Sequence, residues 1–590
     1  MKELKITYEQ RIRELDRQAG RNQKQLFASG VSRLALFGGA AAMAYLALGQ
    51  SAWYGVPGLA LLALFAFQVA RHQDLKYQSR RLQELLRINQ TELQVLSGQF
   101  GDLPDGAKYR DPAHPFSEDL DLFGQGSFFQ YLNRTGMAPG AEMLARLLCA
   151  NQTDGIAGRQ EVLQELSPQI DWRQEFLCTA RLLQAPVTPG ELYPWLEQYK
   201  PQLPEWARYF PAVFSLGSLG TALLVILGLL PPGFLAGVFF AGLLITLPFS
   251  KRLARLASDT GKVQETFSQY QRLVALVEGH TFHSANLLAA KGALLSEGTP
   301  VSSRMKAFSR LISALDQRNN LLVALAGNGF FLWELRQAAA VETWIRENGR
   351  EVRAWFTALA AFDAQVCLAN FAYNHPGFAY PEIHPGTMRL RAEGLVHPLL
   401  REVAVRNDLR IENGHFFVIT GANMAGKSTF LRAVGLSLVM ANTGLPVAAR
   451  NYTYNPAPLL SSMRTSDSLS RQESYFFAEL KRLKMIVDRI HKEPCFVVLD
   501  EILKGTNSRD KAEGSRKFLE RLTALGATGL IATHDLSLCE VANRLPGVHN
   551  YYFDAEVRHG ELYFDYRLQS GVSTNMNASF LLRKMGVVEE

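Results

Sequence analysis

Cysteine is scarce in this sequence, with five residues among 590, and no two of them form a C-x-x-C pair. Their odd number and wide spacing exclude a disulfide framework and a conventional zinc site, and they fit a reducing cytosol. Charged residues make up only 20% of the chain, whereas hydrophobic residues make up 47%. This balance is too apolar for intrinsic disorder and too polar for a transporter with many membrane spans.

Charge is absent altogether from two long stretches, residues 34–70 and 209–250. Turn-forming residues interrupt each stretch near its middle, at 50–57 in the first and at 230–233 in the second. The apolar segments on either side approach the ~17–25 residues that a membrane-spanning helix needs. The sequence therefore predicts two transmembrane helical hairpins. Buried core hairpins of a large soluble protein are the alternative.

Lys and Arg flank both hairpins and are missing from their short turns. Arg33 and Arg71 border the first hairpin, and Arg208 and Lys251 border the second. Because Lys and Arg near membrane helices stay on the cytoplasmic side, all four outer ends are expected in the cytosol. The predicted location is the inner cell membrane, multi-pass, with cytosolic N- and C-terminal domains. The net charge of +7 permits lipid or nucleic acid as an anionic partner and selects neither.

Composition and periodicity divide the chain into seven parts. From about residue 395, β-branched runs alternate with helical patterns, which is typical of an α/β domain. The predicted parts are a basic cytosolic helix (1–30), the first hairpin (31–72), a helix and linker (73–118), a helical core (119–208), the second hairpin (209–250), a second part of the core with lever helices (251–390), and the α/β domain (391–590).

A strand-like run at 415–420 leads into a glycine-containing loop, and a helical pattern follows. The loop consists of Gly421, Ala422, Asn423, Met424, Ala425, Gly426, Lys427, Ser428 and Thr429. This is the G-x-x-x-x-G-K-S spacing of a phosphate loop, whose backbone N–H groups converge on phosphates at a helix N-terminus. Lys427 supplies a charge for the β- and γ-phosphates, and the Ser428 hydroxyl is a magnesium ligand. The loop predicts binding of ATP with Mg²⁺.

Two further strand-like runs end in residues suited to hydrolysis. The run at 496–499 is followed by Asp500 and Glu501. Asp500 would hold the magnesium, and Glu501 would orient and deprotonate the attacking water. The run at 529–533 is followed by His534, placed to sense the γ-phosphate. Carboxyl ends of parallel strands meet at one edge of a sheet, so Lys427, Glu501 and His534 are the predicted catalytic residues of an ATPase.

A helix is predicted to begin within 467–479, where Phe476 starts a run of apolar residues at helical spacing. Ser470 and Glu473 form a possible capping box. A hydroxyl-rich helix N-terminus can bind phosphate, and an ordinary capped surface helix is the alternative.

Together these motifs resemble the ATPase domain of the MutS mismatch-repair family, within the ABC ATPase superfamily. The matching stretches are ITGANMAGKSTFLR, the helix start from Ser474 to Glu479, LDEILKGTNSRD and ATHD. A weaker similarity covers the helical segments 119–200 and 260–390. The resemblance implies a C-terminal ABC-type P-loop ATPase domain behind an all-α, MutS-like core that the second transmembrane hairpin interrupts.

The resemblance also implies partners and further site residues. ATPase domains of this family pair, so a homodimer is expected, in which Ser474 reaches the γ-phosphate of the partner subunit's ATP. Residues 505–508 would face the partner's site, and Asn407 is expected near the adenine. DNA is a possible partner by the same resemblance.

Departures from the family pattern limit this analogy. Mismatch-reading members carry an N-terminal domain with a Phe-x-Glu wedge, where this chain has a basic tail and a hairpin. The second hairpin lies where the family inserts its DNA clamp, and no small nuclease domain is expected at the C-terminal end. The interpretation is a membrane-anchored, MutS-related ATPase without the mismatch-recognition domain. The alternatives are a transporter-like ABC ATPase, disfavoured by Ile502-Leu503 after Glu501, and a nucleotide-binding membrane scaffold.

Overall fold

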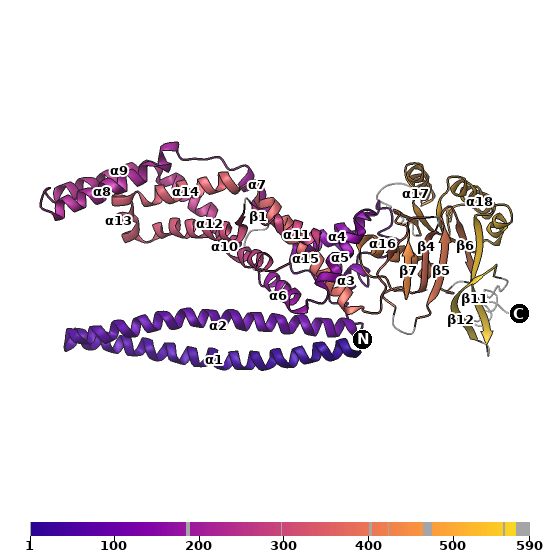
Figure 1. Cartoon of the computed structure of the whole chain (residues 1–590), viewed down its shortest axis with the longest axis horizontal. Helices are drawn as coiled ribbons and strands as arrows, with labels where there is room; N and C mark the ends of the chain where they lie inside the picture. The colour runs from indigo at the N-terminus through magenta and orange to yellow at the C-terminus, as the bar shows by residue number, and fades with distance from the viewer. Residues whose placement is uncertain are drawn as a thin grey trace.

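Two helical arms extend to the same side of a helical body, and an α/β domain lies at the opposite end of the molecule (Figure 1). The computed structural model describes residues 2–183, 189–296, 298–386, 388–400, 404–422, 424–463, 475–558 and 561–573. The helical region before residue 375 and the α/β sheet domain after it agree with the predicted fold class.

The first arm is an antiparallel pair of long helices, α1 (Lys2–Gly49) and α2 (Gly55–Leu96), joined through a short 3₁₀ turn at Ala52–Tyr54. With 48 residues, α1 is ~70 Å long at 1.5 Å per residue. The charge-free stretch forms the outer part of both helices, where Leu48 is 92% exposed. The polar helices expected before and after the hairpin are continuous with its apolar helices.

The helical body is built around α15 (Val352–Asn374), which packs against α4, α5 and α6. The other body helices are α3 (Phe128–Leu132), α4 (Ala138–Ala150), α5 (Ile156–Leu166), α6 (Ile170–Arg181), α7 (Pro189–Glu197) and α11 (Ala285–Gly292). Asp363 of α15 accepts hydrogen bonds from the N–H groups of Gly136 and Met137, which fixes the start of α4. The core therefore surrounds one long central helix.

The second arm carries the other charge-free stretch. It consists of α8 (Phe210–Ile226), α9 (Gly233–Thr246), α10 (Ser250–Glu278), α12 (Val301–Asp316), α13 (Leu321–Phe331) and α14 (Trp333–Asn348), with a small hairpin of β1 (Leu295–Ser296) and β2 (Thr299–Pro300). The sequence analysis did not single out α13, an apolar helix that packs on α9 and α8. Gly242 of α9 meets the backbone of Gly329 of α13, and the rings of Phe239 and Phe330 lie 5.3 Å apart. The apolar part of this arm thus contains three helices.

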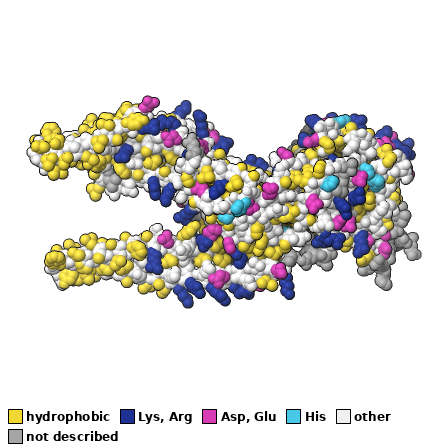
Figure 2. Space-filling view, in the orientation of Figure 1, with side chains coloured by type: hydrophobic (Ala, Val, Ile, Leu, Met, Phe, Trp, Pro, Cys, Tyr) yellow, Lys and Arg dark blue, Asp and Glu magenta, His cyan; other side chains and the backbone are white. Residues whose placement is uncertain are grey.

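Among the residues that the structure describes, four helical segments are long and apolar enough to cross a membrane. Three belong to the arms, Lys2–Gly49, Ala52–Leu96 and Gly233–Glu278, and their most apolar windows are 6%, 6% and 11% buried. The fourth is α15, whose window is 72% buried, which marks it as a protein core helix. Figure 2 shows hydrophobic side chains gathered at the outer ends of both arms, with Lys and Arg nearer the body. The exposed apolar surface of the molecule is therefore concentrated on the arm tips.

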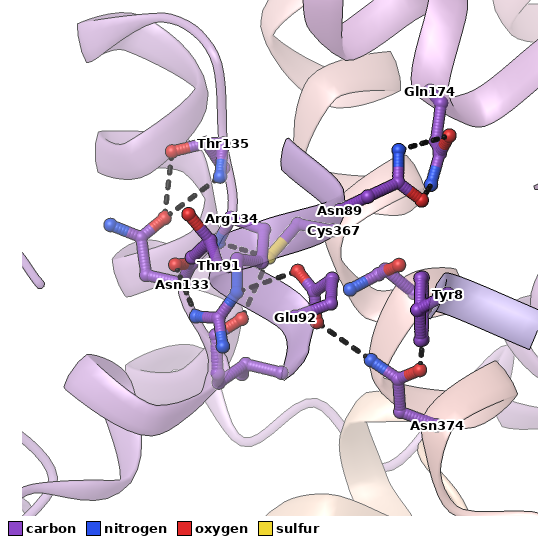
Figure 3. A network of polar contacts seen from close by, with 12 residues as sticks. Tyr8, Asn89, Thr91, Glu92, Asn133, Arg134, Thr135, Gln174, Cys367 and Asn374 are labelled. Carbon is purple, nitrogen blue, oxygen red and sulfur yellow. Dashed lines mark hydrogen bonds and ion pairs between the residues drawn. The ribbon is translucent and has the colours of Figure 1, made fainter. Parts of the chain in front are cut away.

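A buried polar network fixes the first arm to the body (Figure 3). Tyr8 of α1 donates a hydrogen bond to Asn374 Oδ1 at 2.7 Å, and Asn374 Nδ2 donates to Glu92 Oε2 of α2 at 2.8 Å. Arg134 Nε donates to Glu92 Oε1 at 2.8 Å, with the two side chains 4% and 2% exposed. Both helices of the arm are thus tied to the C-terminal end of α15.

The α/β domain contains two sheets. The larger has the order β12-β11-β6-β10-β9-β8, parallel except for β12, and the smaller has the order β3-β7-β4-β5. The large sheet consists of β6 (Phe416–Gly421), β8 (Leu459–Ser462), β9 (Phe496–Asp500), β10 (Thr528–Ala532), β11 (Val548–Arg558) and β12 (Glu561–Ser570), and the small one of β3 (Glu382–Ile383), β4 (Met388–Leu395), β5 (Asn407–Glu412) and β7 (Asn451–Tyr454). The helices are α16 (Lys427–Thr443), α17 (Tyr475–Ile490) and α18 (Ser508–Ala524).

The central strands β6, β9 and β10 of the large sheet are buried on both faces, as expected of parallel strands. Along β6, Phe417 and Ile419 join the core that contains α16, whereas Phe416 and Val418 join the core that contains α17 and α18. In the pairing register, Ala532 of β10 lies between Ile419 of β6 and Asp500 of β9. The carboxyl ends of the three predicted strands therefore stand side by side.

Candidate active site

A cavity of about 610 Å³ opens at the carboxyl ends of β6, β9 and β10, beside the N-terminus of α16. Its lining brings together Lys427, Ser428, Asp500, Glu501 and His534, which the sequence places in three separate segments. Met424, Gly426, Thr429 and Asn407 also line it. The residues predicted for hydrolysis and for magnesium thus share one cavity, whereas Gly421, Ala422 and Ala425 of the predicted phosphate loop are not part of its lining.

The loop from β6 to α16 adopts a conformation that depends on its glycines. Gly421 has φ +141°, and a Cβ there would lie 2.5 Å from the carbonyl oxygen of Phe553. Gly426 has φ +99° and is the N-cap of α16, with a would-be Cβ 3.1 Å from the ring of Tyr566. These positions bring the loop backbone and the free N–H groups of the helix to the cavity, where an anion is favoured.

Lys427 lies at the bottom of this loop with 6% of its surface exposed. Its Nζ donates hydrogen bonds to the carbonyl oxygens of Gly421 and Ala422, both at 2.8 Å. Burial lowers the pKa of Lys427 below its ordinary value, and the charges of Asp500 and Glu501 act in the opposite direction. The ammonium is therefore held in place by the loop, facing two carboxylates.

Glu501 and His534 form the closest polar pair in the cavity, with His534 Nε2 2.8 Å from Glu501 Oε1. Nε2 also lies 3.3 Å from Lys427 Nζ. A carboxylate can only accept a hydrogen bond, so His534 Nε2 carries a hydrogen and donates a hydrogen bond to Glu501. Lys427 makes a close polar contact with the same ring. The hydrogen bond from His534 is the largest cause that lowers the pKa of Glu501 to about 2.

Ser428 and Asp500 are the residues predicted to hold magnesium. Both line the cavity next to Lys427, Ser428 from the first turn of α16 and Asp500 from the end of β9. A hydroxyl and a carboxylate are oxygen ligands of the kind that Mg²⁺ prefers when phosphates and water complete its shell. The two side chains therefore fit the ion that their sequence motifs imply.

Backbone strain is concentrated around this cavity. In the described part of the chain, seven non-glycine residues have positive φ, and four of them, Met424, Glu501, Leu503 and Tyr566, line the cavity or lie within two residues of its lining. Non-glycine residues in the left-handed region cost of order 1–3 kcal/mol each and persist where the surrounding structure holds them. This concentration supports a functional role for the cavity.

The lining of the cavity also contains residues that no sequence motif predicted. Tyr566 of β12, Leu395 and His397 line it together with Asn407. Asn407 Nδ2 donates to the carbonyl oxygen of Tyr566, and Asn407 Oδ1 accepts from the N–H of Leu568. Asn407 thus fixes the strand that carries Tyr566. No motif marks Tyr566, because its approach to Gly426 depends on how β12 lies at the sheet edge.

Several predicted residues lie outside the described part of the chain. These are Asn423 in the phosphate loop, Ser474 before α17, and the proposed capping box of Ser470 and Glu473. The helix predicted from Phe476 onward is present as α17.

Comparison with known proteins agrees with the geometry of this domain. The family MutS domain V matches residues 417–583. The chain is 32% identical over 253 residues to a DNA mismatch repair protein MutS of Sorangium cellulosum, covering 41% of this chain and 27% of that protein. It is 30% identical over 288 residues to a DNA mismatch repair protein MutS of Nitratidesulfovibrio vulgaris, covering 47% and 30%.

A human relative, MutS protein homolog 4, is 29% identical over 195 residues, which cover 31% of this chain and 20% of that protein. The chain therefore spans less than a third of the length of these curated relatives. The match to MutS domain V and identities near 30% support a relationship of this chain to the MutS family, with the domain match at residues 417–583.

Proposed function

We propose that this protein is a membrane-anchored, MutS-related ATPase that binds and hydrolyses ATP with magnesium as a homodimer. The observation that carries the proposal is the convergence of Lys427, Ser428, Asp500, Glu501 and His534 on one cavity at the carboxyl ends of three parallel strands. Ligands of open parallel sheets bind in such a position.

In the proposed reaction, the phosphates of ATP bind at the N-terminus of α16. Lys427 exchanges its bonds to the loop carbonyls for the β- and γ-phosphate oxygens. Ser428 and Asp500 would hold Mg²⁺, which neutralises phosphate charge when bound. Glu501 orients the attacking water, and His534 holds the Glu501 carboxylate toward the cavity. The aromatic ring of Tyr566, which lines the cavity beside Gly426, suits the purine ring.

We infer the homodimer from the relationship of this chain to the MutS family. Residues 474 and 505–508 are proposed to approach the nucleotide of the partner subunit, so that each site is completed by both chains. Gly505 to Ser508 lead into α18 directly after the Glu501 loop.

We further propose that the arm tips insert into a lipid bilayer. The apolar windows of the arm helices are almost entirely unburied, which is costly in water and favourable in lipid. The exposed Leu321 and Leu322 of α13 extend this surface next to α8 and α9. Lys and Arg border both hairpins, so both chain ends belong on the cytosolic side of the inner membrane.

Membrane insertion has a direct test with a matched control. The full chain should stay in the membrane fraction through high-salt washes and dissolve only in detergent. Phe240→Lys, at a 64% exposed position in the middle of α9, should weaken retention, because a charge at the centre of a membrane helix costs about 2.5–3.5 kcal/mol. Leu536→Lys, at a 40% exposed position on the α/β domain, should leave retention unchanged. Recovery of the unmodified chain in the soluble fraction would refute insertion.

ATP hydrolysis is tested on the full chain purified in detergent. Phosphate release should require Mg²⁺ and should be measured with and without duplex, branched and mismatched DNA. Stimulation of ATP hydrolysis by DNA would identify nucleic acid as a partner of this protein. Absence of Mg²⁺-dependent hydrolysis under every condition would refute the proposed activity.

A further inference from the structure

Glu479 is a buried carboxylate that faces the loop following Glu501. It lies in the second turn of α17 with 3% of its surface exposed. Its Oε1 accepts the N–H of Leu503 at 2.5 Å, and its Oε2 accepts the N–H of Lys504 at 3.1 Å. One side chain thus binds two consecutive backbone donors.

The loop that Glu479 holds is strained. Glu501 has φ +50° and Leu503 has φ +59°, values that side chains other than glycine rarely adopt. At its beginning the loop is fixed by the N–H of Glu501, which donates to the carbonyl oxygen of Ala532 in β10 at 2.9 Å. Such a conformation persists only where its surroundings over-determine it. Glu479 supplies that restraint at the far end of the loop.

Packing supports the same contact. A Cβ on Gly505 would lie 2.8 Å from Phe476 Cβ and 3.2 Å from Phe476 Cα. The first turn of α17 and the loop are therefore in direct contact, with no room for a side chain between them. Ile502 and Leu503 are 2% and 7% exposed, so the loop also packs against the hydrophobic core.

We propose that Glu479 is a positioning residue for hydrolysis: its carboxylate fixes the backbone of Leu503 and Lys504 and thereby keeps the side chain of Glu501 at His534 and the cavity. The inference rests on the proposed ATPase activity. It ties the placement of Glu501 to α17, the helix that begins one residue after Ser474.

The test compares Glu479→Ala, Glu479→Gln and a control, Asp488→Ala, in the full chain. Asp488 lies on the same helix, is 54% exposed and pairs with Lys484. Glu479→Ala should lower kcat at least tenfold, since small misplacements of a catalytic group can cost ~100-fold, while the Kd for ATP changes less than about threefold. Glu479→Gln should lose less, because its amide oxygen still accepts one N–H. Asp488→Ala should behave as the wild type.

Gly505→Ala tests the contact from the other side, since its methyl group would push the loop away from Phe476. It should lower kcat, as Glu479→Ala does, whereas the affinity for ATP is compared only between Glu479→Ala and the wild type, because residue 505 is itself proposed to approach the partner subunit's nucleotide. Parallel losses of kcat and ATP affinity in Glu479→Ala, or no loss of kcat in either variant, would overturn the positioning role while the wild-type activity stands. An inactive wild type would instead refute the proposed function and this inference with it. Should Glu479→Ala fail to fold, a folded Glu479→Gln variant with wild-type kcat would overturn the inference.

Discussion

Tyr8 and Asn374, 366 positions apart in the sequence, share a 2.7 Å hydrogen bond where the first arm meets the body. Asn374 is the last residue of α15, and the chain runs from there toward the first strand of the small sheet. The bond therefore lies between the base of a proposed membrane arm and the entry to the proposed ATPase domain. Any movement of the arm relative to α15 must distort this junction.

Breaking the junction should destabilise the protein markedly. Glu92→Gln leaves Arg134 buried without a carboxylate, and loss of one partner from a buried pair costs about 3–5 kcal/mol. The midpoint of thermal unfolding in detergent should fall accordingly. Asp171→Ala, which removes the exposed partner of Arg11 on the same arm, should cost less than about 1 kcal/mol. Equal effects of the two variants would show that the buried network contributes no more to the stability of the protein than the exposed ion pair does.

His375, next to this junction, should make stability fall in mild acid. Its Nε2 accepts the Tyr131 hydroxyl at 2.8 Å, and its Nδ1 donates to the carbonyl oxygen of Phe371. Burial lowers its pKa from 6.5 to about 4, so the unfolded chain takes up a proton that the folded chain refuses. Stability should be full above pH 6.5 and fall by up to about 1.4 kcal/mol per pH unit between 6.5 and 4.

The measurement for His375 is the unfolding free energy against pH, for the wild type and for His375→Gln. The Gln side chain can still accept from Tyr131 but does not titrate. The variant should show a shallower slope between pH 6.5 and 5. Identical slopes would assign the acid sensitivity to other groups.

A composite active site should appear in mixed dimers. Lys427→Ala and Ser474→Ala homodimers should both be inactive, because each lacks one half of every site. In a mixed dimer both lesions meet in one site and leave the other intact, so partial ATPase activity should return. Unmixed Lys427→Ala protein at the same total concentration is the control. No recovery, after subunit exchange has been demonstrated, would argue against a shared site.

DNA binding, where it occurs, should come from phosphate contacts by Lys and Arg. Affinity should then fall linearly in log K against log[salt], and a single mismatch should raise it by less than roughly tenfold, worth about 1.4 kcal/mol. Competition between matched and mismatched duplexes at one salt concentration measures this. A preference near a hundredfold would reveal a mismatch-reading element that the sequence analysis did not find.

The sequence was most informative where function depends on short-range order. The phosphate loop, Asp500-Glu501 and His534 each follow a buried strand directly, so their convergence could be inferred from strand order alone. The two helical hairpins could also be predicted, because an uncharged stretch is recognised in the sequence without any tertiary context.

Other features depend on contacts between distant segments. Tyr566 reaches the cavity from an edge strand. Tyr8 forms a hydrogen bond with Asn374, which lies far away in the sequence. Neither contact leaves a local pattern in the sequence. Helix α13 escaped notice because its apolar run is 11 residues long and contains Gly-Asn-Gly, too short and too polar to suggest a membrane helix. In the sequence Glu479 looks like any other glutamate of a helix, and its hydrogen bonds to the N–H groups of Leu503 and Lys504 are visible only in three dimensions.

The most direct test of the account is the activity of Glu501→Gln in the full chain with ATP and Mg²⁺. The variant keeps Lys427, Ser428 and Asp500, so it should bind ATP with an affinity close to that of the wild type. Turnover should fall by at least about 100-fold, because the neutral amide cannot take up the proton of the attacking water as the carboxylate can. Glu520→Gln, an exposed position on α18, is the matched control and should hydrolyse ATP normally. Wild-type turnover by Glu501→Gln would contradict the proposed mechanism.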